Sequence, residues 1–465
     1  MADVVERLRR VVGPGHVAAG PAVDPDDTHD ESLTGVPVVP AAVVRPGSTA
    51  EVTEVLALAH ATRVPVVARG AGTGLSGACR PVAGGIVVAF DRMDRVLEVD
   101  PDNQVAVVQP GVTLARLDAE IEPLGLVYPV SPGEAGASIG GTVATNAGGM
   151  RAVRYGVTRH RVLGLEAVLA GGEVVRTGGR YVKCSSGYDL TQLIVGSEGT
   201  LALVTEATLK LEHRPAGAAT LLAPFATLGE VSRAVLRVVA GGLTPTILEY
   251  LDALTMAGIT GAAGIDLGVP EAVRADASAF LVVVVEATRE DRLEEDAATV
   301  AGLLAELGAL DVYVLPPHAG ADLITARERA FFVAKAAGAD DLLDSVVPRA
   351  AVPGYLATVA RLAERHGAIV SGCGHVADGN VHVSIFQPDA ARRHALLHDV
   401  YRATVDVGGA VSGEHGIGTE KLPYFLALED PVKLALQRRI KAAFDPRGIL
   451  GPGRVLGEIP AGAGG

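Results

Sequence analysis

Short apolar runs of strand length alternate with glycine-rich stretches over the first two hundred residues. Residues 48–51 have the sequence of a helix-capping box, and the apolar residues after it recur at helical spacing: Val52, Val55, Leu56 and Ala59. A helix therefore begins near residue 49. The strands expected in this half are 41–45, 64–68, 85–90, 96–100, 105–109, 163–170, 173–177 and 201–211, with further helices at the N-terminus and over 113–123.

The pattern changes near residue 213, where glycines become rarer and the periodic segments become longer. This change predicts strands over 280–287 and 311–315, and helices over 290–307, 319–337, 355–365 and 390–407. Their order favours an α+β arrangement with an antiparallel sheet covered on one face. We expect three parts in the chain: 1–212, 213–410 and a C-terminal segment 411–465 that returns to the first part.

Composition narrows the possible functions. A chain of 465 residues is longer than a domain with one ordinary hydrophobic core, and 49% of its residues are hydrophobic, which is enough for more than one such core. The formal net charge of −14, with 4% aromatic residues and no tryptophan, disfavours nucleic acid and anionic membranes as general partners. The three cysteines form no metal-binding pair, and the chain has no transmembrane-length apolar run and no apolar signal segment. These features predict a cytoplasmic protein.

The segment 69–77 contains the pattern G-x-G-x-x-G at Gly72, Gly74 and Gly77. A dinucleotide-binding Rossmann loop opens directly into a helix, but here the chain continues through Pro81 and Gly84 into a strand. The sequence therefore disfavours a Rossmann fold and predicts a nest of backbone amides for a diphosphate. Two further glycine clusters, 138–149 and 187–200, indicate an extended ligand.

Histidines mark a second kind of chemistry near the end of the chain. If Asp378 and Gly379 form a two-residue hairpin turn, His375 lies directly opposite His382. Opposed side chains have Cβ atoms about 4.5–5.5 Å apart, which places both imidazoles within reach of one metal ion. Residues 414–415, Glu-His, follow in a glycine-framed segment, and neighbouring residues of an extended segment point to opposite faces. We expect one of them to be a ligand and the other a free base, against the alternative that the histidines are packed polar residues.

The glycine clusters, with the motif 196–200, resemble the FAD-binding domain of the vanillyl-alcohol oxidase type. The segments 374–382, 413–418 and 444–446 resemble the C-terminal half of its D-2-hydroxy-acid dehydrogenase branch, which includes D-lactate dehydrogenase, the glycolate oxidase FAD subunit and D-2-hydroxyglutarate dehydrogenase. The resemblance covers nearly the whole chain. It implies non-covalent FAD, because Ala71 lies where relatives with a histidyl-linked flavin carry histidine.

The resemblance also assigns roles to residues. His375, His382 and Glu414 would bind a divalent metal, Zn or Mn, with His415 as the base and Arg327 and Asn380 as substrate contacts. The flavin would be held by Arg69, Gly70, Ala71, Gly72, Thr73, Gly74, Ser76, Gly77, Pro132, Gly133, Ser138, Gly140, Gly141, Thr142, Thr145, Asn146, Gly149, Glu198 and Gly199.

These parts fit the oxidation of a small 2-hydroxy acid to the 2-oxo acid. The metal orients the substrate and lowers its hydroxyl pKa, His415 takes the proton, and a hydride passes to flavin N5. Leu342, near the place of a lysine in hydroxyglutarate-type relatives, favours D-lactate or glycolate over D-2-hydroxyglutarate. Reoxidation requires an acceptor such as a quinone, a cytochrome, an electron-transfer flavoprotein or oxygen.

Other functions remain open at this stage. The chain could be a flavin-binding subunit of a multi-subunit glycolate oxidase, an ether-lipid-type FAD transferase, or a metal hydrolase that binds a nucleotide. The intact Glu414-His415 pair disfavours a non-catalytic subunit, and the histidine hairpin disfavours the transferase. A homodimer and peripheral attachment to the inner face of the membrane are further expectations.

Overall fold

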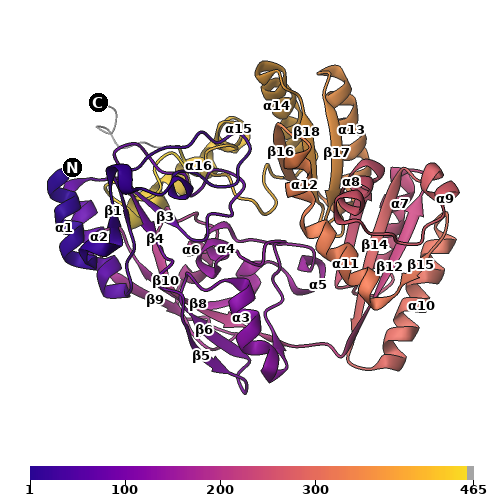
Figure 1. The fold of residues 1–465 in the computed structure, drawn as a ribbon, viewed down its shortest axis with the longest axis horizontal. Helices are drawn as coiled ribbons and strands as arrows, with labels where there is room; N and C mark the ends of the chain where they lie inside the picture. The colour runs from indigo at the N-terminus through magenta and orange to yellow at the C-terminus, as the bar shows by residue number, and fades with distance from the viewer. Residues whose placement is uncertain (458–465) are drawn as a thin grey trace.

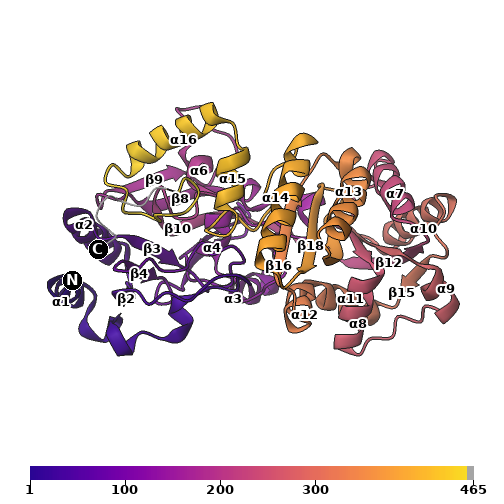
Figure 2. The ribbon, with the colours of Figure 1, turned by 90° about the horizontal axis from the view of Figure 1, so that it is seen from above.

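The computed structural model describes residues 1–457; the last residues of the glycine-rich terminus, 458–465, lie outside the described part. The chain builds two groups of sheets that lie side by side along the long axis of the molecule (Figure 1). The elements before about residue 213 form one group, and the long strands and helices after it form the other. The final segment crosses back to the first group, where α15 (Leu422–Leu428) and α16 (Pro431–Phe444) lie (Figure 2).

The first group contains two main sheets. Four short strands form the first, in the order β1-β2-β4-β3: β1 (Val17–Ala18), β2 (Ala42–Val44), β4 (Ile86–Ala89) and β3 (Val66–Arg69). Five antiparallel strands form the second, in the order β5-β6-β10-β8-β9: β5 (Val96–Asp100), β6 (Val105–Val108), β10 (Leu203–Lys210), β8 (Val162–Val168) and β9 (Val174–Gly178). The helices are α1 (Ala2–Val12), α2 (Thr49–Thr62), α3 (Leu114–Ile121), α4 (Ile139–Thr145), α5 (Ala152–Tyr155) and α6 (Leu190–Ile194). A two-stranded pair, β7 (Leu126–Val127) with β11 (Glu212–His213), ends this half.

The second group is built on one seven-stranded antiparallel sheet. Its order is β15 (Tyr313–Leu315), β12 (Gly217–Phe225), β14 (Ala279–Ala287), β13 (Ile247–Asp252), β17 (Ile369–Gly374), β18 (Asn380–Phe386) and β16 (Asp341–Val346). The helices on one face are α7 (Leu228–Ala240), α10 (Glu290–Glu306), α13 (Val352–Arg365) and α14 (Ala390–Asp406). The others in this half are α8 (Ala253–Ala263), α9 (Glu271–Asp276), α11 (Pro317–Glu328) and α12 (Ala330–Ala336).

Two expectations from the sequence require correction here. The sheet is covered on both faces, because α8 and α11 pack on the face opposite α7 and α10 through a separate apolar cluster that includes Met256, Ile259 and Leu323. The helix expected over 319–337 is two helices, α11 and α12, which meet at Arg329. Both helices contribute residues to the site described below.

The early strands agree closely with the sequence pattern, as does the absence of a helix after the glycine loop. Ser48 caps α2 by accepting a hydrogen bond from the Glu51 amide at 3.3 Å, while the Glu51 carboxylate accepts from Gly47. After β3 the chain runs through residues 70–85 directly into β4. The loop is therefore not a Rossmann loop, as its sequence indicates.

Candidate active site

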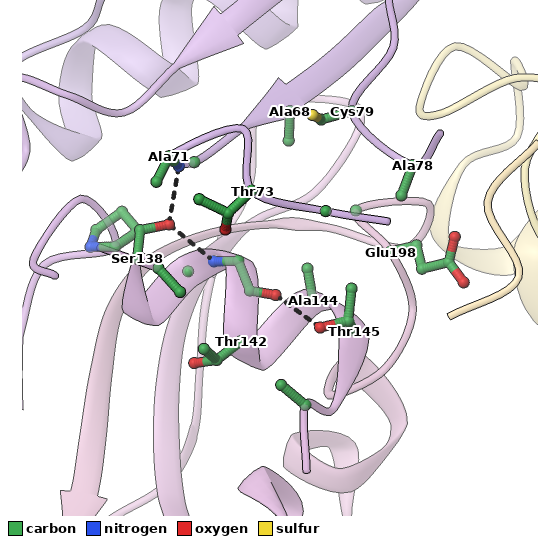
Figure 3. Close-up of a pocket in the computed structure, with 18 of the residues that line it drawn as sticks. Ala68, Ala71, Thr73, Ala78, Cys79, Ser138, Thr142, Ala144, Thr145 and Glu198 are labelled. Atoms are coloured by element: carbon green, nitrogen blue, oxygen red, sulfur yellow. Dashed lines mark hydrogen bonds between the residues drawn. The ribbon is translucent and has the colours of Figure 1, made fainter. Parts of the chain in front are cut away.

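The glycine loop forms one wall of a cavity, and α4 forms the facing wall (Figure 3). Ser138, the N-cap of α4, accepts hydrogen bonds on Oγ from the amides of Ala71 and Gly141, both at 3.2 Å. A Cβ atom added to Gly70 would lie 2.1 Å from that same oxygen. The two walls approach so closely only because residue 70 has no side chain.

Most of the residues expected to hold the flavin line this first cavity. They are Gly70, Ala71, Gly72, Thr73, Gly74, Pro132, Ser138, Gly140, Gly141, Thr142, Thr145, Glu198 and Gly199. Gly133 and Gly149 line a second cavity instead. Arg69, Ser76, Gly77 and Asn146 line neither cavity.

Arg69 and Asn146 support the walls from behind. The Arg69 guanidinium donates to the His29 carbonyl at 2.7 Å and lies 3.5 Å from Asp27. Asn146 ends α4 in the left-handed conformation, with φ 52°, and accepts from the Arg159 amide at 2.9 Å. Their side chains fix the loop and the helix.

Ser76 and Glu198 connect the first cavity to the segment 413–418. Ser76 Oγ donates to the main-chain carbonyl of His415 at 2.5 Å. The Glu198 carboxylate, although part of the cavity lining, accepts from the amides of Ile417 at 2.6 Å and Gly418 at 2.8 Å. Gly77 is tightly packed against the same segment, because an added Cβ would lie 2.2 Å from Thr419 Oγ1.

The histidine hairpin differs from its predicted register by two residues. His382 on β18 pairs with Cys373 rather than with His375, which lies in the connection between β17 and β18. A shift of two positions keeps a side chain on the same face of a sheet. The two rings therefore still meet, with their Nε2 atoms 3.3 Å apart.

His375, His382 and Glu414 converge on one point. Glu414 Oε1 lies 3.2 Å from Nε2 of each histidine, and the three donor atoms lie within 4.8 Å of one another. The ligand atoms of a second group also lie within 4.8 Å of one another: Asp344, His382 and His415. All of these side chains are buried or nearly buried, and imidazole with carboxylate is a donor set that Zn²⁺ and similar ions accept.

Asp344 on β16, which the sequence did not single out, holds residues 412–415 in place. Its fully buried carboxylate accepts from the amides of residues 413, 414 and 415, from Ser412 Oγ and from Lys421 Nζ at 2.9 Å. Burial raises the pKa of a carboxyl group, but Lys421 and then His415 hold the pKa of Asp344 well below its usual range. The group is therefore a fixed negative charge beneath the site.

Glu249 on β13 is the second buried carboxylate that the sequence did not single out. It contacts His375 Nδ1 and lies 2.8 Å from Arg327 Nη2. Burial lowers the pKa of His375, but Glu249 and Glu414 outweigh it and raise that pKa to about 10. Without an ion His375 is therefore protonated, and Glu249 orients its ring in the way that outer carboxylates orient metal-binding imidazoles.

His415 is the residue expected to act as the base. Its ring stacks on that of His382 at 5.0 Å between centroids, and Nδ1 lies 3.8 Å from Asp344. Burial lowers the pKa of His415 to about 4, with Asp344 opposing the shift. The imidazole is neutral near neutral pH, so a ring nitrogen can accept a proton.

The two cavities meet at this histidine. Both are lined by Leu75, Pro132, Glu414 and His415. The second cavity also contains Arg327, His375 and His382. A ligand of the first cavity and a ligand of the second can thus approach each other across residues 414–415.

Asn380 does not line either cavity. Its amide nitrogen donates to Asp344 Oδ1 at 2.8 Å and to the Ser345 carbonyl at 3.0 Å. The sequence placed Asn380 in contact with substrate; the structure places it behind the site, where it supports Asp344.

The chain matches two known protein-family models. Residues 40–178 match the model of an FAD binding domain, and residues 214–455 match that of the C-terminal domain of FAD linked oxidases. The chain is an FAD-linked oxidase. The matched regions contain most of the lining residues of the first cavity and all of those of the second, so the family assignment and the geometry concern largely the same residues.

Relatives of this FAD-linked oxidase include enzymes of 2-hydroxy acids. It is 52% identical to an uncharacterized FAD-linked oxidoreductase of Mycobacterium tuberculosis, over 98% of this chain and 100% of the relative. It is 34% identical to the glycolate oxidase subunit GlcD of Bacillus subtilis, over 98% and 97%. It is also 37% identical to a D-lactate dehydrogenase of Archaeoglobus fulgidus, over 90% and 91%.

The fold agrees with the same assignment. The structure of p-cresol methylhydroxylase with substrate bound superposes with a TM-score of 0.81 and 18% identity, over 98% of this chain and 96% of the other. The FAD-linked oxidase therefore has the vanillyl-alcohol-oxidase-type fold, as the sequence indicates. Among residues 1–457, no helix has the length and apolar character needed to cross a bilayer.

The first cavity fits an FAD molecule. Glycine, alanine, serine and threonine make up most of its wall, and no lysine or arginine is among its lining residues in the described chain. Small side chains leave the backbone of the loop and of α4 accessible to a ligand. A diphosphate there would be bound by backbone amides rather than by cations, which agrees with the nest indicated by the sequence.

Proposed function

We propose that this FAD-linked oxidase is a dehydrogenase that oxidises a D-2-hydroxy acid to the 2-oxo acid. The observation that carries the proposal is the sharing of Glu414 and His415 by the two cavities. One cavity has the small-residue lining that a flavin requires, and the other contains a base, a cation and a group of metal-binding side chains. When FAD is bound it accepts the hydride from C2 of the substrate.

Arg327 would bind the substrate carboxylate. It lines the second cavity, and its side chain is almost fully buried. Its Nε atom is buried without a hydrogen-bond partner in the described chain. A guanidinium group that still has a free N–H can donate it to a carboxylate in a charge-assisted pair.

His375, His382 and Glu414 would hold a divalent ion, Zn or Mn. Such an ion lowers the pKa of a bound hydroxyl group and orients it. Glu249 would set the ring of His375, and Asp344 would fix the backbone that positions Glu414. The two carboxylates outside the ligand set are thus assigned to orientation.

His415 would take the hydroxyl proton. It is neutral at the pH of the reaction because burial lowers its pKa. Its carbonyl is held by Ser76 and its amide by Asp344. These two bonds fix the ring at the junction of the cavities, where a proton acceptor has to be.

The remaining assignments rest on the sequence. We propose FAD without a covalent link, a division of the chain near residue 213, and a cytoplasmic location, with a quinone, cytochrome or electron-transfer flavoprotein as acceptor. Asn380, by contrast, is assigned from the structure, to positioning through Asp344 rather than to substrate contact. Leu342 at the second cavity favours D-lactate or glycolate over D-2-hydroxyglutarate.

The test uses the purified holoprotein and an artificial dye as acceptor. We expect a flavin absorbance spectrum and reduction of the dye with D-2-hydroxy acids. His415→Ala should retain the yellow flavin and lose turnover, whereas His398→Ala, at an exposed histidine on α14, should retain both. Turnover by a flavin-loaded His415→Ala protein would remove His415 from the role of base, and a colourless protein would overturn the function.

A further inference from the structure

The second cavity extends well beyond the proposed metal-binding residues. Strands β16, β18 and β17 form the floor of this cavity, and residues paired across the three strands form rows. His382 pairs with Cys373 on one side and Asp344 on the other, and Ser384 pairs with Ser371 and Leu342. At the end of β18, Phe386 lines the cavity and pairs with Ile369.

The side chains in the rows farther from the histidines carry no charge. The step from His382 to Phe386 is four residues, or about 14 Å along an antiparallel strand at ~3.4 Å per residue. Over that length the lining side chains of the floor are two serine hydroxyls, a leucine and a phenylalanine.

Helices α8 and α12 form the opposite wall, and it is neutral too. From α8 it receives Leu254, Thr255, Gly258 and Ile259, and from α12 Ala330, Phe331, Val333 and Ala334. The charged lining residues of the described chain lie elsewhere, at the proposed metal centre and at the junction with the first cavity, where Glu328 accepts from Ser131 Oγ at 3.2 Å.

This distribution restricts the substrate's side chain. A second carboxylate, as in 2-hydroxyglutarate, would be buried among these apolar groups, and none of the outer lining residues of the second cavity in the described chain is a cation that could pair with it, which is strongly unfavourable. The hydrogen of glycolate or the methyl of lactate would leave the outer rows uncovered. An apolar chain of several carbons would cover them and displace water.

We propose that the preferred substrate is a monocarboxylic D-2-hydroxy acid with an apolar side chain longer than methyl. The proposal rests on the function proposed above and replaces lactate or glycolate as the favoured acid. The chemistry at C2 is unchanged, and the part of the molecule that differs is the group that lies between β18 and α8.

The experiment compares kcat/KM of the holoenzyme for glycolate, D-lactate, D-2-hydroxyhexanoate and D-2-hydroxyglutarate with a dye acceptor. Each buried methylene contributes about fourfold, from ~0.8 kcal/mol per CH₂. The three additional methylenes of hydroxyhexanoate should thus raise kcat/KM over lactate by roughly 60-fold. Hydroxyglutarate should be used more slowly than lactate.

The second part of the experiment uses variants whose larger side chains fill part of the second cavity. A Cβ at Gly258 would lie 3.5 Å from Val333 Cγ1, which is ordinary contact, so Gly258→Leu can be accommodated while occupying space between α8 and α12. We expect the ratio of kcat/KM for hydroxyhexanoate to that for lactate to fall at least tenfold. Gly261→Leu is the matched control, because Gly261 is exposed on the same helix and a Cβ there meets nothing within 4 Å. Ala334→Met, on α12, repeats the test should Gly258→Leu fail to fold.

The outcomes separate the two proposals. Absence of turnover with all four acids by a yellow protein overturns the proposed function. Turnover with glycolate, lactate or hydroxyglutarate preferred to hydroxyhexanoate overturns the chain-length proposal and leaves the dehydrogenase intact. An unchanged ratio in both cavity variants also overturns it, because the chain then lies somewhere else.

Discussion

Ser76 Oγ donates a hydrogen bond to the carbonyl of His415, across 339 positions of the chain. Ser76 follows the glycines that line the first cavity, and His415 lies where the first and second cavities meet. The bond therefore connects the loop expected to bind the cofactor with the residue expected to move the proton. The bond is partly buried, and Ser76 itself is 1% exposed.

Replacing Ser76 with alanine should lower turnover more than it lowers flavin content. The substitution leaves a carbonyl without its donor, a loss of about 1–3 kcal/mol for a buried group. If much of that loss falls on the placement of the base, kcat drops by roughly tenfold, which corresponds to ~1.4 kcal/mol. Steady-state kinetics and absorbance per protein measure the two effects. Ser232→Ala, at a buried serine of α7, is the control and should leave kcat unchanged.

Asp344 and Lys421 should behave as a coupled pair. Asp344→Asn leaves the Lys421 ammonium buried without its counter-charge, and breaking such a pair costs about 3–5 kcal/mol. Lys421→Met alone should also lower the free energy of unfolding, because it leaves the Asp344 carboxylate buried without its cation. The double variant should be less destabilised than the sum of the single changes by about 1–3 kcal/mol. Denaturant unfolding of all four proteins tests this, and strictly additive losses would contradict the pairing.

A metal at the histidine centre should load more tightly as the pH rises. In the ion-free protein His375 is protonated, since Glu249 and Glu414 raise its pKa to about 10. An ion must displace that proton, so its apparent affinity should increase between about pH 6 and pH 8. Titration of chelator-treated protein with Zn²⁺ and Mn²⁺ measures this. His382→Ala should abolish binding while retaining flavin, and equal binding by that variant would exclude the triad.

Leu342→Lys should change the choice of acid. The side chain lines the outer part of the second cavity beside Ser384, so an ammonium there would pair with a second carboxylate. We expect kcat/KM for D-2-hydroxyglutarate to rise at least tenfold and that for D-2-hydroxyhexanoate to fall. Leu342→Met retains the apolar lining and should change neither. A lysine variant with the selectivity of the parent would place the substrate's side chain elsewhere.

The sequence predicted the parts of the site that depend on local periodicity. The two histidines meet although their register was wrong by two residues, because a shift of two preserves the face. The glycine loop was placed correctly because its sequence continues into a strand. Both features follow from the local sequence: the face of the sheet on which each histidine lies, and the element that follows the loop.

The buried carboxylates depend on distant partners. Glu249 is a lone charged residue within the apolar run 247–251, and this was the available signal that it has a buried partner. Asp344 is satisfied by amides some seventy residues later and by Lys421. The family resemblance implied that Asn380 contacts substrate, yet its amide nitrogen donates to Asp344. Partners of this kind follow from tertiary packing rather than from spacing.

Residues 449–451 extend the first sheet, since the Val66 amide donates to the Ile449 carbonyl and the Gly451 amide donates to the Val66 carbonyl, both at 2.8 Å. During synthesis, β3 leaves the ribosome nearly four hundred residues before this partner. The edge of β3 is thus completed only once residue 451 has been synthesised, after both the glycine loop and residue 415. A chain that stops before residue 449 should therefore leave this edge of β3 unpaired and fail to retain the cofactor.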